Sequence, residues 1–237
     1  MKTIILAGGK GTRLAPYNTI FPKPLVPLGD RAILDIIIQQ LEHLGFADIT
    51  ISLGYLGELI EAYIRNGSPH VVKANISFVR EREPLGTVGA LSLVTGLNET
   101  FMSINGDTLT TLDYRKLVEH HKKSNSIMTI AVNKKDIKID FGVIETNEND
   151  FLVNFTEKPH FQYKVGMGVY VYEPEVLKYI APGQRFDFPD LVWKILDDGK
   201  RISTYNSDDY WLDLGTHIDY EKAQSEYELM KGKLLPV

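Results

Sequence analysis

A glycine-rich loop directly after the first strand constrains this chain more than any other feature. Residues 2–7 are apolar and predict a strand, and glycines 8, 9 and 11 follow it together with Lys10 and Arg13. Glycine has no Cβ, so the backbone can turn sharply and direct its N–H groups toward an anion. An ordinary tight turn is the alternative interpretation, but two cations beside those amides favour a polyphosphate.

A second short segment adds another constrained cation. Lys23 lies between Pro22 and Pro24, and the two prolines stiffen the chain and limit where the amine can point. The spacing excludes two better-known phosphate loops. A dinucleotide fingerprint requires glycine where Leu14 stands, and a P-loop requires serine or threonine after the lysine, whereas Gly11 follows Lys10.

The composition bounds the remaining possibilities. With 237 residues, 43% hydrophobic and 24% charged, the chain has the size and make-up of one large globular domain. It has no cysteine, which excludes disulfides, thiolate nucleophiles and Cys-ligated zinc. A net charge of −5 without a basic run argues against nucleic acid as a partner. We find no signal-peptide core and no membrane-spanning run, so no membrane association and a cytoplasmic location are expected.

The first half of the chain alternates strand and helix patterns. This alternation predicts right-handed βαβ crossovers and a Rossmann-like, mostly parallel sheet with helices on both faces. Predicted strands cover residues 2–7, 48–53, 75–80 and 101–104, and predicted helices cover residues 31–44, 56–65, 87–94 and 114–123.

The second half is richer in strands and predicts antiparallel hairpins added to the sheet. We expect one mixed α/β domain over residues 1–237, with a small antiparallel, substrate-facing lobe from about 140 to 205. Predicted strands cover residues 127–132, 141–145, 151–156, 168–172, 202–205 and 210–212, and predicted helices cover residues 175–180, 188–196 and 220–231.

Ligands of open α/β sheets bind beyond the carboxyl ends of the parallel strands, where four loops of this chain should meet. One of them ends in Asp107, and Asp213 follows a second apolar strand. A turn or a helix cap would explain either aspartate alone. Two carboxylates beside a polyphosphate, however, are what Mg²⁺ requires, because the ion keeps several waters and accepts phosphate oxygens.

A further polar signal ends a strand of the second half. Glu157 and Lys158 precede Pro159, and the pair suits the hydroxyl groups and phosphate of a phosphorylated sugar, although a solvated strand end remains the alternative. Gly142 would either let a substrate approach the backbone or mark a bulge. The histidines match no catalytic motif, and we expect them to be structural or on the surface.

Taken together, these motifs resemble the sugar-1-phosphate nucleotidylyltransferase family. The resemblance runs over about residues 1–225. It rests on residues 8–14 (Gly-Gly-Lys-Gly-Thr-Arg-Leu), 22–27 (Pro-Lys-Pro-Leu-Val-Pro), 83–90 (Glu-Pro-Leu-Gly-Thr-Val-Gly-Ala), 105–107 (Asn-Gly-Asp), 157–159 (Glu-Lys-Pro) and 211–215 (Trp-Leu-Asp-Leu-Gly).

The resemblance implies an enzyme of the EC 2.7.7 type that converts a nucleoside triphosphate and a sugar 1-phosphate into an NDP-sugar and pyrophosphate. It implies Arg13 and Lys23 as catalytic residues and Asp107 and Asp213 as ligands of Mg²⁺. It implies that the sugar phosphate is held by Gly142, Glu157, Lys158 and Gly168. The implied nucleotide-binding residues are Leu6, Ala7, Gly8, Gly9, Gly11, Thr12, Arg13, Glu81, Pro84, Gly86, Thr87 and Asn105.

Several alternatives stay open. Residues 83–89 resemble guanylyltransferases of mannose or heptose 1-phosphate and favour GTP, with a uridylyl- or cytidylyltransferase as the alternative. The family often has an Asn-Ala-Gly where this chain has Gly166-Met167-Gly168, so the sugar is not identified. A non-catalytic regulatory subunit that binds nucleotide sugar is the alternative of another class. A homo-oligomer is compatible with the sequence, and no appended β-helix is expected after the last helix.

Overall fold

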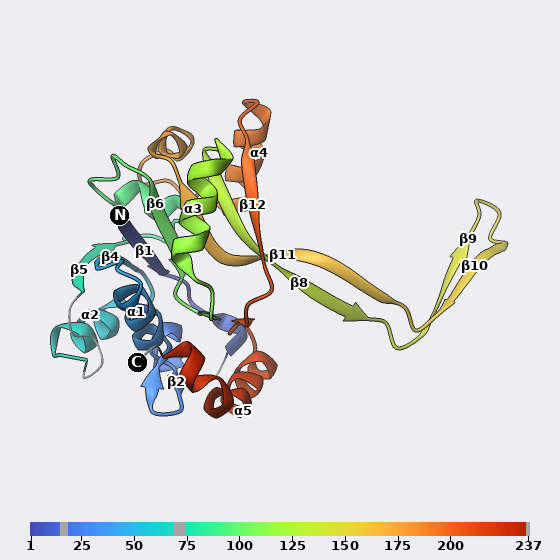
Figure 1. The fold of residues 1–237 in the computed structure, drawn as a ribbon, viewed down its shortest axis with the longest axis horizontal. Helices are drawn as coiled ribbons and strands as arrows, with labels where there is room; N and C mark the ends of the chain where they lie inside the picture. Colours follow the sequence, from blue (N-terminus) through green and yellow to red (C-terminus); the bar gives the residue numbers. More distant parts are fainter. Residues whose placement is uncertain (15–18, 69–73, 236–237) are drawn as a thin grey trace.

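The computed structural model describes residues 1–14, 19–68 and 74–235, which form a layered α/β body with a long arm (Figure 1). The body is built on a seven-stranded sheet in the order β12-β8-β11-β6-β1-β4-β5. Every neighbouring pair is parallel except the two pairs that β11 makes with β6 and β8. The strands are β1 (Lys2–Ala7), β4 (Asp48–Leu53), β5 (Asn75–Arg80), β6 (Phe101–Asn105), β8 (Met128–Lys138), β11 (His160–Tyr172) and β12 (Ile202–Ser207).

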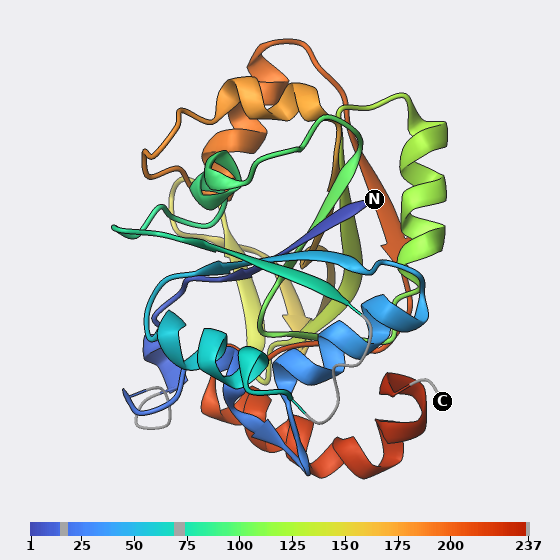
Figure 2. The ribbon, with the colours of Figure 1, turned by 90° about the vertical axis from the view of Figure 1, so that its left-hand side faces the viewer.

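Helical segments cover both faces of this sheet (Figure 2). Successive side chains of a strand point to opposite faces of the sheet, so Ile4 and Ile5 of β1 belong to two different hydrophobic clusters, one on each face. The larger cluster lies under α1 (Ile33–His43), α2 (Gly57–Arg65), α3 (Tyr114–Ser124) and α5 (His217–Leu234). The smaller lies under α4 (Phe188–Asp197) and the 3-10 segments η4 (Gly89–Leu93) and η5 (Pro174–Tyr179). The predicted fold class is therefore confirmed.

Small elements complete the body. The pairs β2 (Pro27–Leu28) with β3 (Arg31–Ala32) and β7 (Thr108–Thr110) with β13 (Trp211–Asp213) form two further antiparallel sheets. The 3-10 segments η1 (Thr12–Leu14) and η3 (Lys23–Leu25) belong to the loop region after β1. Among the described residues, no helix combines the length and apolarity needed to cross a bilayer.

Several local predictions differ from the structure. The segments predicted as helices at 87–94 and 175–180 are short 3-10 turns, η4 and η5. The short strand predicted at 210–212 is present as β13, which pairs with β7. The strands β9 (Gly142–Thr146) and β10 (Leu152–Glu157) pair with each other in a separate two-stranded sheet.

A long arm extends from the body of the fold (Figure 1). Beyond the body, β8 and β11 continue as an antiparallel pair and carry β9 and β10 at their far end (Figure 1). We define the arm as residues 133–165. The change at its base is abrupt, because residues 167–172 of β11 are all buried whereas residues 160–164 are all exposed. The predicted substrate-facing lobe, about residues 140–205, is thus divided between the arm and the body.

Candidate active site

A cavity of about 400 Å³ opens at the carboxyl ends of β1, β5 and β6. This is the edge at which open α/β sheets bind their ligands. Its lining comes from the loop after β1, the loop after β5, the Asn105–Asp107 turn after β6 and the end of β13. Segments as far apart in the sequence as Leu6 and Gly215 therefore meet at one site, as the motifs predict.

The glycine-rich loop is shaped by close backbone contacts. Gly11 has a φ of +61°, a value that glycine adopts without strain. A Cβ on Gly54 would lie 2.4 Å from the carbonyl oxygen of Gly8, so only glycine at position 54 lets the loop pack there. The amide of Tyr55 donates to the same carbonyl at 3.2 Å. These contacts hold the loop in place and leave its outer side facing the cavity.

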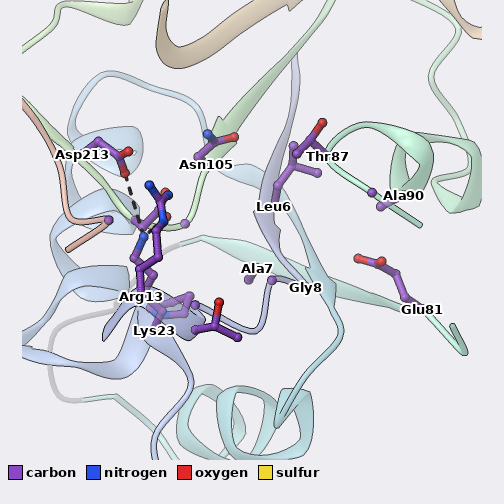
Figure 3. Close-up of a pocket in the computed structure, with 18 residues that line it drawn as sticks. Leu6, Ala7, Gly8, Arg13, Lys23, Glu81, Thr87, Ala90, Asn105 and Asp213 are labelled. Atoms are coloured by element: carbon purple, nitrogen blue, oxygen red, sulfur yellow. Dashed lines mark hydrogen bonds and ion pairs between the residues drawn. The ribbon is translucent and has the colours of Figure 1, made fainter. Parts of the chain in front are cut away.

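Opposite charges gather at one end of the cavity (Figure 3). Lys23 is 8% exposed, and its ammonium group donates to Asp107 and lies 3.9 Å from Oδ1 of Asp213. The pairing of β13 with β7 sets Asp213 opposite Thr108, which places the two carboxylates side by side. Burial, together with the negative charge of Asp107, raises the pKa of the Asp213 carboxyl. Arg13 projects into the same group.

The other end of the cavity has a different chemistry. Glu81 and Thr87 lie there, across from the cationic end (Figure 3). The carboxylate of Glu81 accepts from the hydroxyl of Ser52 at 3.2 Å and from the amide of Leu85 at 2.9 Å, and it packs against Gly8. A carboxylate fixed in this way can accept hydrogen bonds from a flat polar ligand such as a base.

The donor set fits a magnesium ion that is shared with phosphates. Among the described residues, no group of three or more His, Cys, Asp or Glu side chains could form an all-protein metal site. Asp107 and Asp213 provide two adjacent carboxylates, and Mg²⁺ commonly accepts one or two carboxylates with phosphate oxygens and water. The ammonium of Lys23 lies within 4 Å of an oxygen of each carboxylate.

The cavity brings together most of the residues that the sequence predicted. Pro84 does not line it, and Gly168 lies just behind it, where a Cβ would approach Asn105 Nδ2 to 2.7 Å. The predicted residues that line the cavity are Leu6, Ala7, Gly8, Gly9, Gly11, Thr12, Arg13, Lys23, Glu81, Gly86, Thr87, Asn105, Asp107 and Asp213.

The predicted sugar-phosphate residues Gly142, Glu157 and Lys158 lie elsewhere. All three are on the arm, in or next to the β9–β10 hairpin, and none lines the cavity. Figure 1 shows this hairpin far from the body of the same chain. The β8 and β11 strands carry it away, and strand patterns in the sequence do not reveal in which direction a hairpin will project.

Sequence reasoning missed several contributors. Pro24, Ala90, Gly106 and Gly215 line the cavity without having been predicted as site residues. Asp187 also escaped prediction, although its carboxylate accepts from the Thr87 amide at 3.0 Å and fixes the loop after β5. Gly106 and Gly215 each adjoin a predicted aspartate motif and could have been found from it. Asp187 lies 100 residues from Thr87, and no local pattern points to their contact.

Comparison with known proteins identifies the family of the chain. The nucleotidyl transferase family model matches residues 2–229. The chain belongs to the nucleotidyl transferase family. It is 32% identical to a D-glycero-alpha-D-manno-heptose 1-phosphate guanylyltransferase of Aneurinibacillus thermoaerophilus over 96% of this chain and 99% of that protein. The family resemblance predicted from the motifs is confirmed.

Other members of the nucleotidyl transferase family are longer. A UTP–glucose-1-phosphate uridylyltransferase of Synechocystis sp. is 32% identical, and this chain covers 62% of its length. A mannose-1-phosphate guanylyltransferase of Mycobacterium tuberculosis is 30% identical, with 64% of its length covered. The crystal structure of HddC from Yersinia pseudotuberculosis superposes with a TM-score of 0.72 at 26% identity, over 95% of this chain and 99% of that one. HddC has also been solved in complex with GMP-PN.

Proposed function

We propose that this protein transfers a nucleotidyl group from a nucleoside triphosphate to a sugar 1-phosphate, releasing an NDP-sugar and pyrophosphate. The observation that carries the proposal is the cationic end of the cavity, where Arg13 and Lys23 lie beside Asp107 and Asp213. Four charged groups of this kind suit two anionic substrates and one divalent ion. The relatives, which are named as transferases of this class, support the same reaction.

The chemistry follows from the charges. An oxygen of the sugar phosphate attacks the α-phosphorus, and the bond to the oxygen that bridges to the β-phosphate breaks on the opposite side. The attacking oxygen is already anionic, so no serine, cysteine or histidine base is needed. The protein has to align two mutually repelling anions and neutralise their charge, which is the main contribution to catalysis in phosphoryl transfer.

Each residue then has a distinct role in the proposal. Lys23 contacts the α-phosphate and the incoming phosphate, and Arg13 neutralises the departing pyrophosphate. The glycine-rich loop holds the nucleotide through its amides. Asp107 and Asp213 hold Mg²⁺, which supplies positive charge to the phosphates when bound. Glu81 and Thr87 lie at the end of the cavity that remains for the base.

GTP is the favoured nucleotide. The Glu83-Pro84-Leu85-Gly86-Thr87 segment favours it, and so do the heptose 1-phosphate guanylyltransferase relative and the GMP-PN complex of HddC. The uridylyltransferase relative keeps UTP as the alternative. A non-catalytic binding subunit is disfavoured because Arg13, Lys23, Asp107 and Asp213 all line the cavity. The cytoplasmic location stays a prediction from the sequence.

A substrate panel tests the proposal. Each nucleoside triphosphate is incubated with Mg²⁺ and each of a set of hexose, heptose and amino-sugar 1-phosphates, and pyrophosphate release is measured. We expect one productive pair, with GTP as the nucleotide. Lys23→Ala should lower kcat by about 100-fold or more, the scale of losing one charge-stabilising donor. Lys122→Ala, which removes an exposed lysine of α3, should keep wild-type turnover. Absence of pyrophosphate with every pair would contradict the proposal.

A further inference from the structure

The three arm residues with predicted roles form one local group. Gly142 pairs with Glu157 across the β9–β10 hairpin, and a Cβ at position 142 would lie 3.1 Å from Oε2 of Glu157. Lys158 follows with a φ of +45°, a conformation that non-glycine residues avoid and that concentrates at functional sites. Its ammonium lies 4.0 Å from Glu157 Oε1. The three residues therefore contact or adjoin one another, but they lie outside the cavity of their own chain.

The base of the arm is fixed to the body. The carbonyl oxygen of Met167 accepts hydrogen bonds from Trp211 Nε1 at 2.9 Å and from Thr108 Oγ1 at 3.2 Å. Gly168 has a φ of +74° and packs against Asn105. Beyond this point the strand pairing runs without irregularity from Gly166 opposite Val132 to His160 opposite Lys138. These contacts direct the hairpin outward, so a return to its own cavity would require breaking them.

The end of the arm exposes much apolar surface. Seventeen large hydrophobic residues are exposed among the described residues, and nine of them lie between residues 137 and 163. They are Ile137, Phe141, Ile144, Phe151, Leu152, Val153, Phe155, Phe161 and Tyr163. An isolated two-stranded sheet is marginally stable in water, and apolar patches of this kind mark interaction sites. We therefore expect the exposed apolar side chains of the hairpin to pack against another surface.

We propose that the arm docks on a second copy of this chain and brings Glu157 and Lys158 to the cationic end of the partner's cavity. The inference rests on the proposed function and on the sugar-phosphate residues predicted from the sequence, because Gly142, Glu157 and Lys158 do not line the cavity of their own chain. A second copy is the occupant that completes this site, since it presents the same cavity to the same arm. Two copies exchanging arms about a twofold axis form a closed dimer in which both sites are complete.

Two exposed apolar residues come just before Lys23 in the sequence. Ile20 and Phe21 are 69% and 53% exposed and precede the Pro22-Lys23 segment that leads into the cavity. Apolar residues of the arm can pack there while Lys158 adds a third cation to Arg13 and Lys23. Cations placed against transferring phosphates stabilise the charge that develops on them. The same contact thus buries the hairpin and completes the substrate site.

Sedimentation and cross-linking test the dimer without reference to activity. Wild-type protein should sediment as a dimer, and the double variant Phe141→Asp/Phe151→Asp should sediment as a folded monomer. Leu229→Asp, which alters a similarly exposed residue on α5, should stay dimeric.

The chain has no cysteine, so Gly9→Cys/Lys158→Cys can be joined specifically with a bismaleimide. A product of twice the chain mass on a denaturing gel is expected, whereas internal cross-links alone would overturn the proposal.

Mixed dimers test the shared site. Differently tagged Lys23→Ala and Lys158→Ala chains are co-expressed, and each is inactive alone under the proposal. A mixed dimer unites one intact cavity with one intact arm, so random assortment should restore about one quarter of the wild-type activity. No recovery in a preparation that contains mixed dimers would overturn the exchange. If the wild type transfers no nucleotide with any substrate, the proposed function fails, while sedimentation and cross-linking still decide the docking.

Discussion

At the scale of single residues, the packing of the site depends on glycines, which have no side chain. A Cβ on Gly8 would lie 2.1 Å from Oε1 of Glu81, whereas a Cβ on Gly9 would meet nothing within 4 Å. Glu81 is held by hydrogen bonds from Ser52 and Leu85, so its displacement would break contacts that fix it at the cavity. The two neighbouring glycines therefore have different tolerances for the same methyl group.

We accordingly predict that Gly8→Ala weakens nucleotide binding more than Gly9→Ala does, because only the first displaces Glu81. Loss of one or two hydrogen bonds that hold Glu81 corresponds to a rise of about tenfold in KM for the triphosphate. Steady-state kinetics with both variants measures this, and thermal melts check that each is folded. Equal KM values for Gly8→Ala and Gly9→Ala would show that Glu81 does not contact the nucleotide.

Most of the site residues predicted from local sequence patterns lie together at one cavity, because the motifs that contain them are local. The loop after β1, the Asn105-Gly106-Asp107 turn and the residues around Asp213 are each compact, and the open α/β fold brings strand ends together. Asp187 shows that local patterns do not predict contacts between residues far apart in the sequence. Its contact with Thr87 joins residues that are far apart in the sequence, and its own neighbourhood has no distinguishing feature.

At the scale of elements, the junction between the body and the arm lies within β11 and depends on one glycine. Gly168 has a φ of +74°, and a Cβ there would lie 2.8 Å from Thr108 Oγ1 and 2.7 Å from Asn105 Nδ2. Gly166, two residues earlier in the same strand, has ordinary backbone geometry, and a Cβ would meet Ile130 at 3.8 Å. The pair forms a natural control for the same substitution.

Gly168→Ala should lower the free energy of unfolding by about 1–3 kcal/mol, the typical cost of a strained backbone conformation. Gly166→Ala should stay within about 0.5 kcal/mol of the wild type. Urea unfolding of the two variants and the wild type measures the difference. If both variants unfolded at the same urea concentration, the junction would not be under the constraint described above.

A buried histidine should make the fold sensitive to acid. His121 of α3 is 2% exposed, with Nδ1 2.7 Å from Thr129 Oγ1 and Nε2 3.0 Å from Glu173 Oε1. Burial lowers the pKa of His121, although Glu173 opposes the shift. An unfolded histidine binds its proton near pH 6.5, so below this pH the unfolded state holds more protons and stability falls.

The prediction is a loss of unfolding free energy in the wild type as the pH decreases from about 7.5 to 5.5. His121→Gln should be less stable than the wild type at the upper pH, because it loses buried hydrogen bonds, but should lose less on acidification. Urea unfolding at both pH values gives the comparison. The same pH dependence in both proteins would exclude His121 as the responsible group.

Element types were harder to predict than element order. The strand patterns at 141–145 and 151–156 were found, but a period of two does not say which strand is the partner. These strands form β9 and β10 outside the central sheet. The segments at 87–94 and 175–180, predicted as helices, form the 3-10 segments η4 and η5.

At the scale of the whole molecule, the predicted nucleotide-binding residues lie at one edge of the sheet. Three of the predicted sugar-phosphate residues lie on the arm. Alternating strands and helices predicted the layered body, because burial on both faces of a parallel sheet leaves few other arrangements. The sequence did not predict the arm as a separate body. Its direction is set by the tertiary contacts of Met167 and Gly168, which no local pattern encodes.

The central claim concerns which bond of the triphosphate breaks, and ³¹P NMR of the reaction mixture observes this directly. With Mg²⁺, GTP and the productive sugar 1-phosphate, we predict that the sugar phosphate and GTP signals decrease together. Signals of a diphosphate-linked NDP-sugar and of pyrophosphate should replace them in equal amounts. Formation of GDP and inorganic phosphate with unchanged sugar 1-phosphate would contradict the account, because it would show cleavage at the γ-phosphate without transfer to the sugar.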